Sequence, residues 1–369
     1  MTAMRPIPAG STRRVFVALL AWTIAFLASG CLHPKVGPQS LSRDRADYSL
    51  SLSDSWKEQT LLNIVKVRYV DPPIFVDVGS IVSSYTLNQG ASVGGTIVPG
   101  GQSAAALGAS ASFSASPTIT YTPLTGNAYI RALTTPVPVA TMLSIIDSGA
   151  PADIILLASV KSINGLRSPQ VGLHGITLAD TSFLRVLELM REIQASGAVR
   201  FYLKEDADKS QTSVLALRKT NVAPDVEAEI VELRHLLHLN PDATELTIVS
   251  GPLPANDNEI AMQTRSIMGL LQHMAAEVEV PSEDVARHRA LPGFETGRDV
   301  SGVTPMIRVH SSKKKQQDAF VTVHYRDTWF WIDDGDLPSK RAFALLMQLF
   351  TMADTGAKEN LPVVTIPAH

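Results

Sequence analysis

The residues Gly90-Ala91-Ser92-Val93-Gly94 match the G-x-S-x-G pattern in which hydrolases place a nucleophilic serine. That chemistry needs a sharp turn between a strand and a helix, so that the hydroxyl stands exposed beside a catalytic base. Here the five residues lie inside a long alternating Gly/Ser run, which is typical of a strand. We therefore expect no hydrolase elbow, and an envelope hydrolase stays only as a remote alternative function.

Metal chemistry has two candidates. His235 and His238 are three residues apart on a helix predicted over residues 225–239, where they could share a face, but no third ligand is fixed by spacing. Asp333-Asp334-Gly335-Asp336 lacks the spacing of a calcium loop and favours a strand end and helix cap instead. We expect no metal and no cofactor, and since no catalytic constellation is found, we do not expect an enzyme.

The chain's one cysteine, Cys31, has a context that indicates covalent modification. Arg13-Arg14 precede an apolar run over residues 15–28, and the small residues Ser29-Gly30 lead into the cysteine. A basic start, a short apolar core and small residues at the cut are the features of an exported signal peptide. The apolar core falls short of the roughly 20 residues that a membrane-spanning helix needs.

The stretch Leu27-Ala28-Ser29-Gly30-Cys31 resembles the lipobox of bacterial lipoproteins. The resemblance implies that the Cys31 sulfur receives a diacylglyceryl group, that the chain is cut before Cys31, and that the new amine is acylated, for example by palmitate. Each acyl CH₂ buried in lipid contributes about 0.8 kcal/mol, so several chains anchor a protein firmly. The alternative is a plain secretory signal with an incidental cysteine.

Leu32, which follows the cysteine, implies by the same resemblance a place in the outer membrane of a bacterial envelope, facing the periplasm. Thr12-Arg13-Arg14-Val15-Phe16 also looks like a twin-arginine export motif, which would imply export of a folded chain. The export route stays open between the two.

The chain becomes uncharged after its first predicted strand. The 53 residues between Asp77 and Arg131 contain no Asp, Glu, Lys or Arg, although charged residues make up 18% of the 369-residue chain. Within this window apolar residues keep to odd positions and Ser/Thr to even ones, on both sides of Pro99-Gly100-Gly101. A period of two around a turn signal predicts a long amphipathic β-hairpin over residues 74–122.

The candidate interaction residues of this hairpin share the odd, apolar face. They are Ile81, Tyr85, Leu87, Leu107, Phe113, Ile119 and Tyr121. Each predicted arm exceeds the 9–11 residues of a membrane-spanning strand, but a lone hairpin has unsatisfied edges in lipid. Insertion with sister copies, packing on a partner or on the protein's own body, and a disordered linker therefore all stay open.

The remaining sequence predicts a mixed α+β body in the periplasm with the hairpin protruding from it. We expect a signal peptide over residues 1–30, a tether over 31–52, an N-terminal helical domain over 53–172 and a C-terminal α+β domain over 173–369. Hydrophobic residues make up 45% and the net charge is −3, so no basic field indicates nucleic acid. Lys313-Lys314-Lys315 is most simply a solvated turn.

Local patterns predict further elements of the body. Apolar residues at helical spacing, among them Leu61, Ile64 and Val65, predict a helix over residues 53–69, and a second helix is expected over 151–165. Residues 169–175 and 282–305 are expected to be loops. Strands are expected over residues 307–309, 319–325, 329–332 and 362–366, with a turn at 326–328. Trp329, Phe330 and Trp331 form the densest aromatic cluster, which core or interface packing explains better than a ligand cage.

These features together favour a lipid-anchored envelope protein that works by assembly, through a hairpin that contacts sister copies or an envelope partner. The lipoprotein signal, the mixed body and the uncharged hairpin resemble the architecture of the curli export channel family. No motif of that family is matched, and its members use two hairpins per subunit where this chain has one. The resemblance implies the main alternative, a subunit of an oligomeric outer-membrane pore or export channel.

Overall fold

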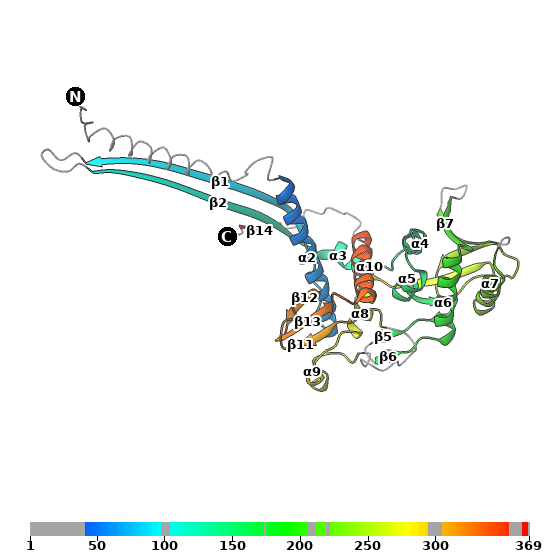
Figure 1. Cartoon of the computed structure of the whole chain (residues 1–369). Coiled ribbons are helices and arrows are strands. Elements are labelled where there is room, and N and C mark those ends of the chain that lie inside the picture. Colours follow the sequence, from blue (N-terminus) through cyan, green and yellow to red (C-terminus); the bar gives the residue numbers. More distant parts are fainter. Residues whose placement is uncertain are drawn as a thin grey trace, which may run out of the picture. The chain divides into compact units, whose positions relative to one another are not determined.

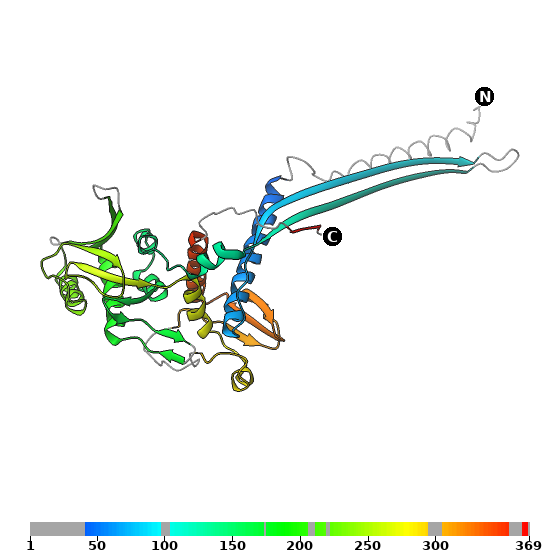
Figure 2. The same cartoon turned by 180° about the vertical axis from the view of Figure 1, so that it is seen from behind.

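The protein has a mixed α+β fold in a computed structural model that describes residues 41–96, 104–172, 175–205, 211–218, 222–293, 305–353 and 364–367. Within these residues the strands form four sheets (Figures 1 and 2). The chain divides into two compact units, which we describe separately. One holds residues up to Ser53 together with Tyr85–Ser114, and the other holds Asp54–Ser84 and Ala115–His369. Cys31 and the predicted signal peptide lie outside the described residues.

Helix α2 spans Leu41–Arg68 and therefore begins inside the segment predicted as a tether. Its residues after Thr60 bury one face, including Leu61, Ile64 and Val65, and this confirms the stripe expected from the helical spacing. The helix ends where Val70 adopts a left-handed backbone, ahead of a Pro-Pro pair that cannot continue the ladder.

The uncharged region forms two long strands, β1 (Val76–Thr96) and β2 (Ala104–Pro123). They are neighbours in a sheet of order β1-β2-β14, where β14 (Val364–Pro367) is the closing strand expected near the end of the sequence. β14 pairs antiparallel with β2 over Thr118 to Tyr121. A short helix that the sequence analysis missed, α3 (Gly126–Thr134), follows β2.

A six-stranded sheet dominates the larger unit, with the order β4-β3-β10-β9-β8-β7. Its strands are β3 (Val160–Ile163), β4 (Leu166–Arg167), β7 (Val199–Glu205), β8 (Gln211–Leu217), β9 (Glu245–Ser250) and β10 (Glu259–Thr264). β9 and β10 run parallel, and the other neighbours run antiparallel. β3 and β4 belong to the predicted N-terminal domain (residues 53–172) and β7 to β10 to the predicted C-terminal domain (173–369). Strands of both predicted domains thus share one sheet.

The predicted helix over residues 151–165 is wrong in its second half. Helix α5 (Ala152–Ser159) ends at Val160, where β3 begins. Asn164 and Gly165 then have φ values of 45° and 86°, which is the backbone of a tight hairpin turn. An Asn-Gly pair favours this turn because both positions tolerate positive φ, so the signal was present in the sequence.

Helices α4 (Val139–Asp147), α5 and α6 (Thr181–Ser196) pack against this sheet, and α7 (Pro224–Leu236) packs against α6. The segment expected as a loop around residues 169–175 carries two short paired strands, β5 (Gln170–Gly172) and β6 (Gly175–Thr177). Strand β10 includes residues 259–263, for which the sequence predicts no element.

A separate three-stranded sheet, of order β11-β13-β12, is made from β11 (His310–Ser312), β12 (Ala319–Tyr325) and β13 (Thr328–Asp333). We call it the β11-β13-β12 sheet. The strand predicted over residues 307–309 begins three residues late. The turn between β12 and β13 is the predicted one, with positive φ at Arg326 and Asp327. α9 (Ser282–Ala286) lies where a loop was expected.

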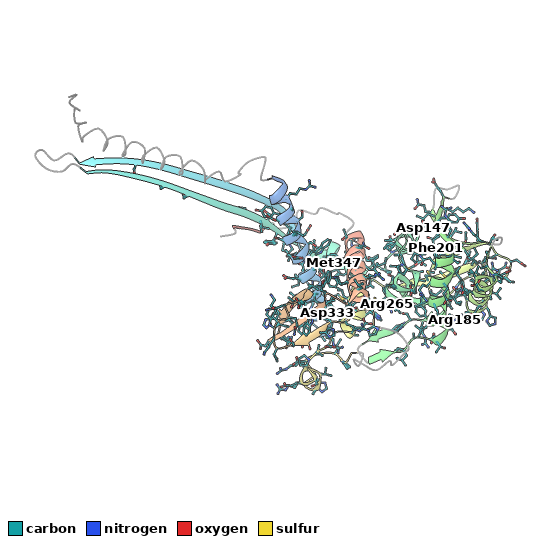
Figure 3. All side chains as sticks on the ribbon, viewed as in Figure 1. Asp147, Arg185, Phe201, Arg265, Asp333 and Met347 are labelled. Atoms are coloured by element: carbon teal, nitrogen blue, oxygen red, sulfur yellow. The ribbon has the colours of Figure 1, made fainter. Side chains whose placement is uncertain are left out.

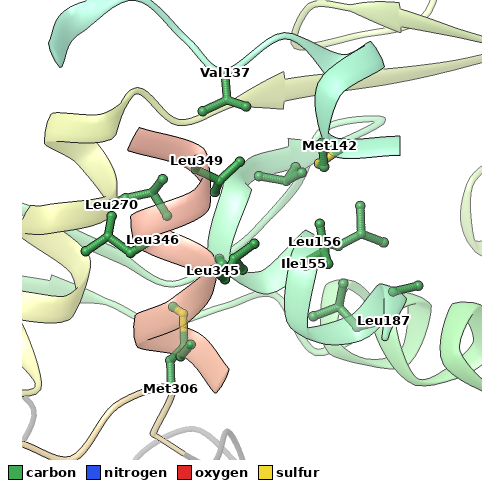
Figure 4. Packing of buried hydrophobic residues seen from close by; sticks show 14 of the residues in the cluster. Val137, Met142, Ile155, Leu156, Leu187, Leu270, Met306, Leu345, Leu346 and Leu349 are labelled. Atoms are coloured by element: carbon green, nitrogen blue, oxygen red, sulfur yellow. The ribbon is translucent and has the colours of Figure 1, made fainter. Parts of the chain in front are cut away.

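The core of the larger unit is one contiguous apolar cluster that includes α2, α8 (Ile267–Ala276) and α10 (Leu337–Ala353). Figure 4 shows Leu345, Leu346 and Leu349 of α10 between Leu270 of α8 and Ile155 and Leu156 of α5. Tyr69, directly after α2, makes edge-to-face contacts with Tyr325 and Phe330, at 5.5 and 6.3 Å between ring centroids. These contacts join the end of α2 to the β11-β13-β12 sheet.

Candidate assembly segment and buried polar clusters

Strands β1 and β2, which we call the β1–β2 segment, approach each other closely. The Ser110 hydroxyl donates to the Gly90 carbonyl at 3.4 Å. A Cβ added to Gly90 would lie 2.8 Å from Ser110 Oγ. Glycine at position 90 thus leaves room for the serine across the ladder. Ser92, Gly94, Ser110 and Ser112, all on the even face, are exposed.

The segment leaves strand edges without partners among the described residues. β1 has β2 as its single neighbour, and β14 covers the outer edge of β2 only over Thr118 to Tyr121. Among the described residues, no strand therefore lies along the outer edge of β1 beyond Val76 or along that of β2 up to Pro117. Such edges are templates for pairing with another strand.

The structure describes the side chains of two of the candidate interaction residues. Ile119 and Tyr121 are half-buried and face Ile366 and Val364 across the ladder with β14. The backbones of the others lie in β1 and β2, while their side chains lie outside the described structure: Ile81, Tyr85, Leu87, Leu107 and Phe113. The structure thus brings Ile119 and Tyr121 together with β14.

Two side-chain amides of α2 hold the base of β1, which the sequence analysis did not anticipate. Asn63 Nδ2 donates to the Ile74 carbonyl at 2.8 Å, and the Ile74 N–H donates to Asn63 Oδ1 at 2.9 Å. Gln59 makes the same two bonds with Val76, at 3.2 and 2.6 Å. Residues four apart on a helix and two apart on a strand have similar spacing, so the amides act as a short extra strand.

Further contacts fix the same junction from the other side. The Leu124 N–H donates to the Phe75 carbonyl at 2.9 Å, and the Tyr129 hydroxyl donates to the Pro73 carbonyl at 2.7 Å. The Phe75 ring stacks on Phe350 of α10 at 4.2 Å between centroids. The first residues of β1 are thereby built into the core of the larger unit.

Arg265, labelled in Figure 3, is a buried cation held by neutral acceptors. Its guanidinium donates to four carbonyls and to the Ser168 hydroxyl at 2.6 to 3.0 Å, and the carbonyls belong to Leu157, Ala158, Val160 and Pro169. Burial lowers its pKa to about 10. These hydrogen bonds link the end of α5 to the segment before β5.

His273 of α8 and Glu277, the residue directly after that helix, form a buried pair with 4.0 Å between His273 Nε2 and Glu277 Oε1. Burial raises the pKa of Glu277 to about 7, against the lowering effect of bonds from the Ile307 and Met306 N–H groups. Burial and the nearby Arg265 charge lower the pKa of His273 to about 3. Glu277 thus fastens residues 306–307 to the end of α8.

The candidate metal residues do not converge. His235 and His238 are both exposed, and His238 lies beyond α7 with a φ of 54°. In the acidic turn, labelled at Asp333 in Figure 3, Asp333 accepts from the Gly335 N–H and Asp336 from the Ser339 N–H and hydroxyl. This confirms the cap. The described residues hold no group of three His, Cys, Asp or Glu side chains suited to a metal ion.

The G-x-S-x-G residues and the aromatic cluster of Trp329, Phe330 and Trp331 both lie within regular strands. Gly90 to Gly94 lie within β1, not at a strand–turn–helix corner. Phe330 is buried in the core, whereas Trp329 and Trp331 lie half-buried on the opposite face of β13.

Comparison with protein-family models gives no match for this chain, and comparisons with curated proteins and with solved structures give none either. In the part of the chain that the structure describes, no helix is both long and apolar enough to cross a membrane.

Proposed function

We propose that the chain is a lipid-anchored protein of the bacterial envelope, attached through Cys31, and that it acts as an assembly component through the β1–β2 segment. The observation that carries the proposal is the pair of strands of 21 and 20 residues without one charged residue after Asp77. Ordinary strands have five or six residues. At about 3.3 Å per residue these strands extend for roughly 65 Å.

The physical argument for a partner is the marginal stability of two strands alone. A two-stranded ribbon in water gains little unless further strands or a packed face support it. The β1–β2 segment has long unpaired edges in the described structure, and natural proteins usually protect such edges with charges or prolines. Over residues 78–96 and 104–116 the two strands carry neither charges nor prolines, so pairing with a strand of a sister copy or of an envelope partner satisfies these edges.

Site-specific cross-linking tests this role. Cys31 is the one natural cysteine, so Ser110→Cys or Ser112→Cys introduces a single new thiol on an exposed strand position. We expect a short thiol cross-linker to join these variants, in intact cells, to a second copy or to one discrete partner. Ser144→Cys, exposed on α4, is the matched control and should give no such product. Equal cross-linking at all three sites would exclude the segment as the contact surface.

A pore subunit is the second candidate, favoured by strand length. Each strand exceeds the 9–11 residues that span a bilayer, and charged side chains facing lipid cost about 2–4 kcal/mol at the midplane. Purified full chain should then oligomerise and release dye from vesicles. An assembled protein that leaves vesicles intact would retain the assembly role and remove the pore.

A further inference from the structure

The outer face of the β11-β13-β12 sheet carries two tryptophans side by side. Trp329 and Trp331 are two apart on β13 and so point to one face, while Phe330 and Ile332 between and after them are buried on the other. The register places His310 opposite Trp331, and His324 opposite Trp329. We call these four residues the Trp face.

The histidines support the indole rings. His310 lies 5.5 Å from Trp331 and His324 lies 4.8 Å from Trp329, measured between ring centroids. Both tryptophans remain partly accessible and His324 is exposed. The rings are therefore held in place at the surface and are not part of the core.

Lysines gather at one end of the Trp face. The Lys315 ammonium lies 5.3 Å from the centroid of the Trp329 ring, and Lys313 Nζ lies 3.3 Å from the Asp327 carbonyl and from the Thr328 hydroxyl. Lys313, Lys314 and Lys315 are all exposed. The turn at Lys313–Lys315, which the sequence predicts only as solvated, thus lies directly beside a partly accessible aromatic ring.

We propose that the Trp face and Lys313–Lys315 dock on an anionic membrane surface. Tryptophan prefers the boundary between apolar and aqueous phases, because its ring is apolar and its N–H is polar. A lysine near an anionic bilayer contributes about 1 kcal/mol, an attraction that fades beyond a Debye length.

Charge complementarity identifies the partner and its orientation. The whole chain has a net charge of −3, so it gains no general attraction to an anionic surface. The acidic groups near the face are Glu279, which contacts His310, and Asp333, at the far end of β13. At the Trp329 end, the three lysines outnumber the exposed Asp318 and Asp327. Within the described Trp face, the Trp329 end therefore combines accessible aromatic surface with a local excess of cations. This proposal does not depend on the role of the β1–β2 segment.

Tryptophan quenching tests the docking. The chain has four tryptophans, so Trp22→Phe with Trp56→Phe leaves Trp329 and Trp331 as reporters. The full chain is reconstituted into vesicles of phosphatidylcholine alone, or mixed with phosphatidylglycerol, with brominated acyl chains as the quencher. We expect quenching in the anionic vesicles and none in the neutral ones. Replacing Lys313, Lys314 and Lys315 by Gln should weaken docking roughly a hundredfold, since each lysine contributes about fivefold, and so abolish the quenching.

A matched control separates this cluster from charge in general. Arg200→Gln, Lys204→Gln and Arg218→Gln remove the same number of exposed cations from the six-stranded sheet region and should leave quenching unchanged. Thermal unfolding of both triple variants checks that the fold is intact. Absence of quenching in anionic vesicles, equal quenching in neutral ones, or equal loss in both triple variants would overturn the proposal. So would a response to soluble heparin without a response to vesicles, which would indicate an acidic glycan instead.

Discussion

The Asn63 side chain and the Ile74 backbone exchange two hydrogen bonds, at 2.8 and 2.9 Å, and so join the buried second half of α2 to the base of β1. Asn63 is 1% exposed. The Asn63 amide thus bonds to the backbone of Ile74, just before β1, as a neighbouring strand would.

Asn63→Ala should destabilise the protein by about 1–3 kcal/mol, because it leaves both polar groups of Ile74 without their partners. Urea unfolding measures the loss, and hydrogen exchange of the Ile74 amide should accelerate in the same variant. Gln272→Ala, an exposed amide on α8, is the control and should change stability by less than about 0.5 kcal/mol. Slow exchange at Ile74 in Asn63→Ala would contradict the role of the amide.

Arg265→Met should cost about 3–5 kcal/mol, since the carbonyls and the hydroxyl that accept from the guanidinium lose their donors together. The exposed Arg131→Met, on α3, provides the comparison and should be nearly neutral. The measurement is the urea midpoint at constant m value. A midpoint for Arg265→Met close to that of the parent would show that other donors replace the guanidinium.

The His273–Glu277 pair predicts a specific pH dependence. Glu277 has a pKa raised to about 7, so the stability it contributes is present below its usual 4.5 and is lost as pH rises through 7. His273 has a pKa lowered to about 3, so its contribution is present above its usual 6.5 and is lost as pH falls toward 3. Between pH 4.5 and 6.5 the two effects oppose each other, and Arg265 and Arg308 are the charges that act on the pair.

Single substitutions should separate the two contributions. In this window the free energy of unfolding of Glu277→Gln should fall on acidification by up to about 1.4 kcal/mol per pH unit relative to the parent, and that of His273→Gln should rise by a similar amount. Urea titrations at several pH values give both slopes. Parallel pH profiles for the parent and both variants would show that the pair does not titrate as described.

Lysine substitution tests which face of the β1–β2 segment takes part in the proposed assembly. Ser112 belongs to the exposed even face, and Ala111 to the odd face that carries the apolar residues. Ala111→Lys should abolish assembly because it buries a charge, whereas Ser112→Lys should be tolerated. Light scattering and the cross-linking yield report the outcome. Equal tolerance at both positions would mean that neither face is a defined contact surface.

Periodicity predicted the elements whose residues repeat locally. The stripe of Leu61, Ile64 and Val65 marked α2, and strict alternation marked β1 and β2, because each pattern depends only on nearby residues. The turn at Asn164-Gly165 was also readable, but the apolar residues before it suited a helix equally well. Helix and strand are not distinguished by short apolar runs.

Contacts between distant residues could not be predicted in this way. Nothing local marks Gln59 and Asn63 as partners of Val76 and Ile74, or Arg265 as the donor to Pro169. In the sequence, Trp329, Phe330 and Trp331 form one aromatic cluster, but the alternation of the strand places Phe330 on the other face. Their proximity to Lys315 depends on the path of the loop between β11 and β12, which composition does not specify.

The pairing of β14 with β2 has a consequence for biosynthesis. A ribosome makes β2 long before β14, so the edge of β2 at Thr118 to Tyr121 stays open while the residues between the two strands are translated. A chain truncated before Val364–Pro367 would present that edge together with the rest of β2. Synthesis of Val364–Pro367 is thus the step that allows the base of β2 to be covered.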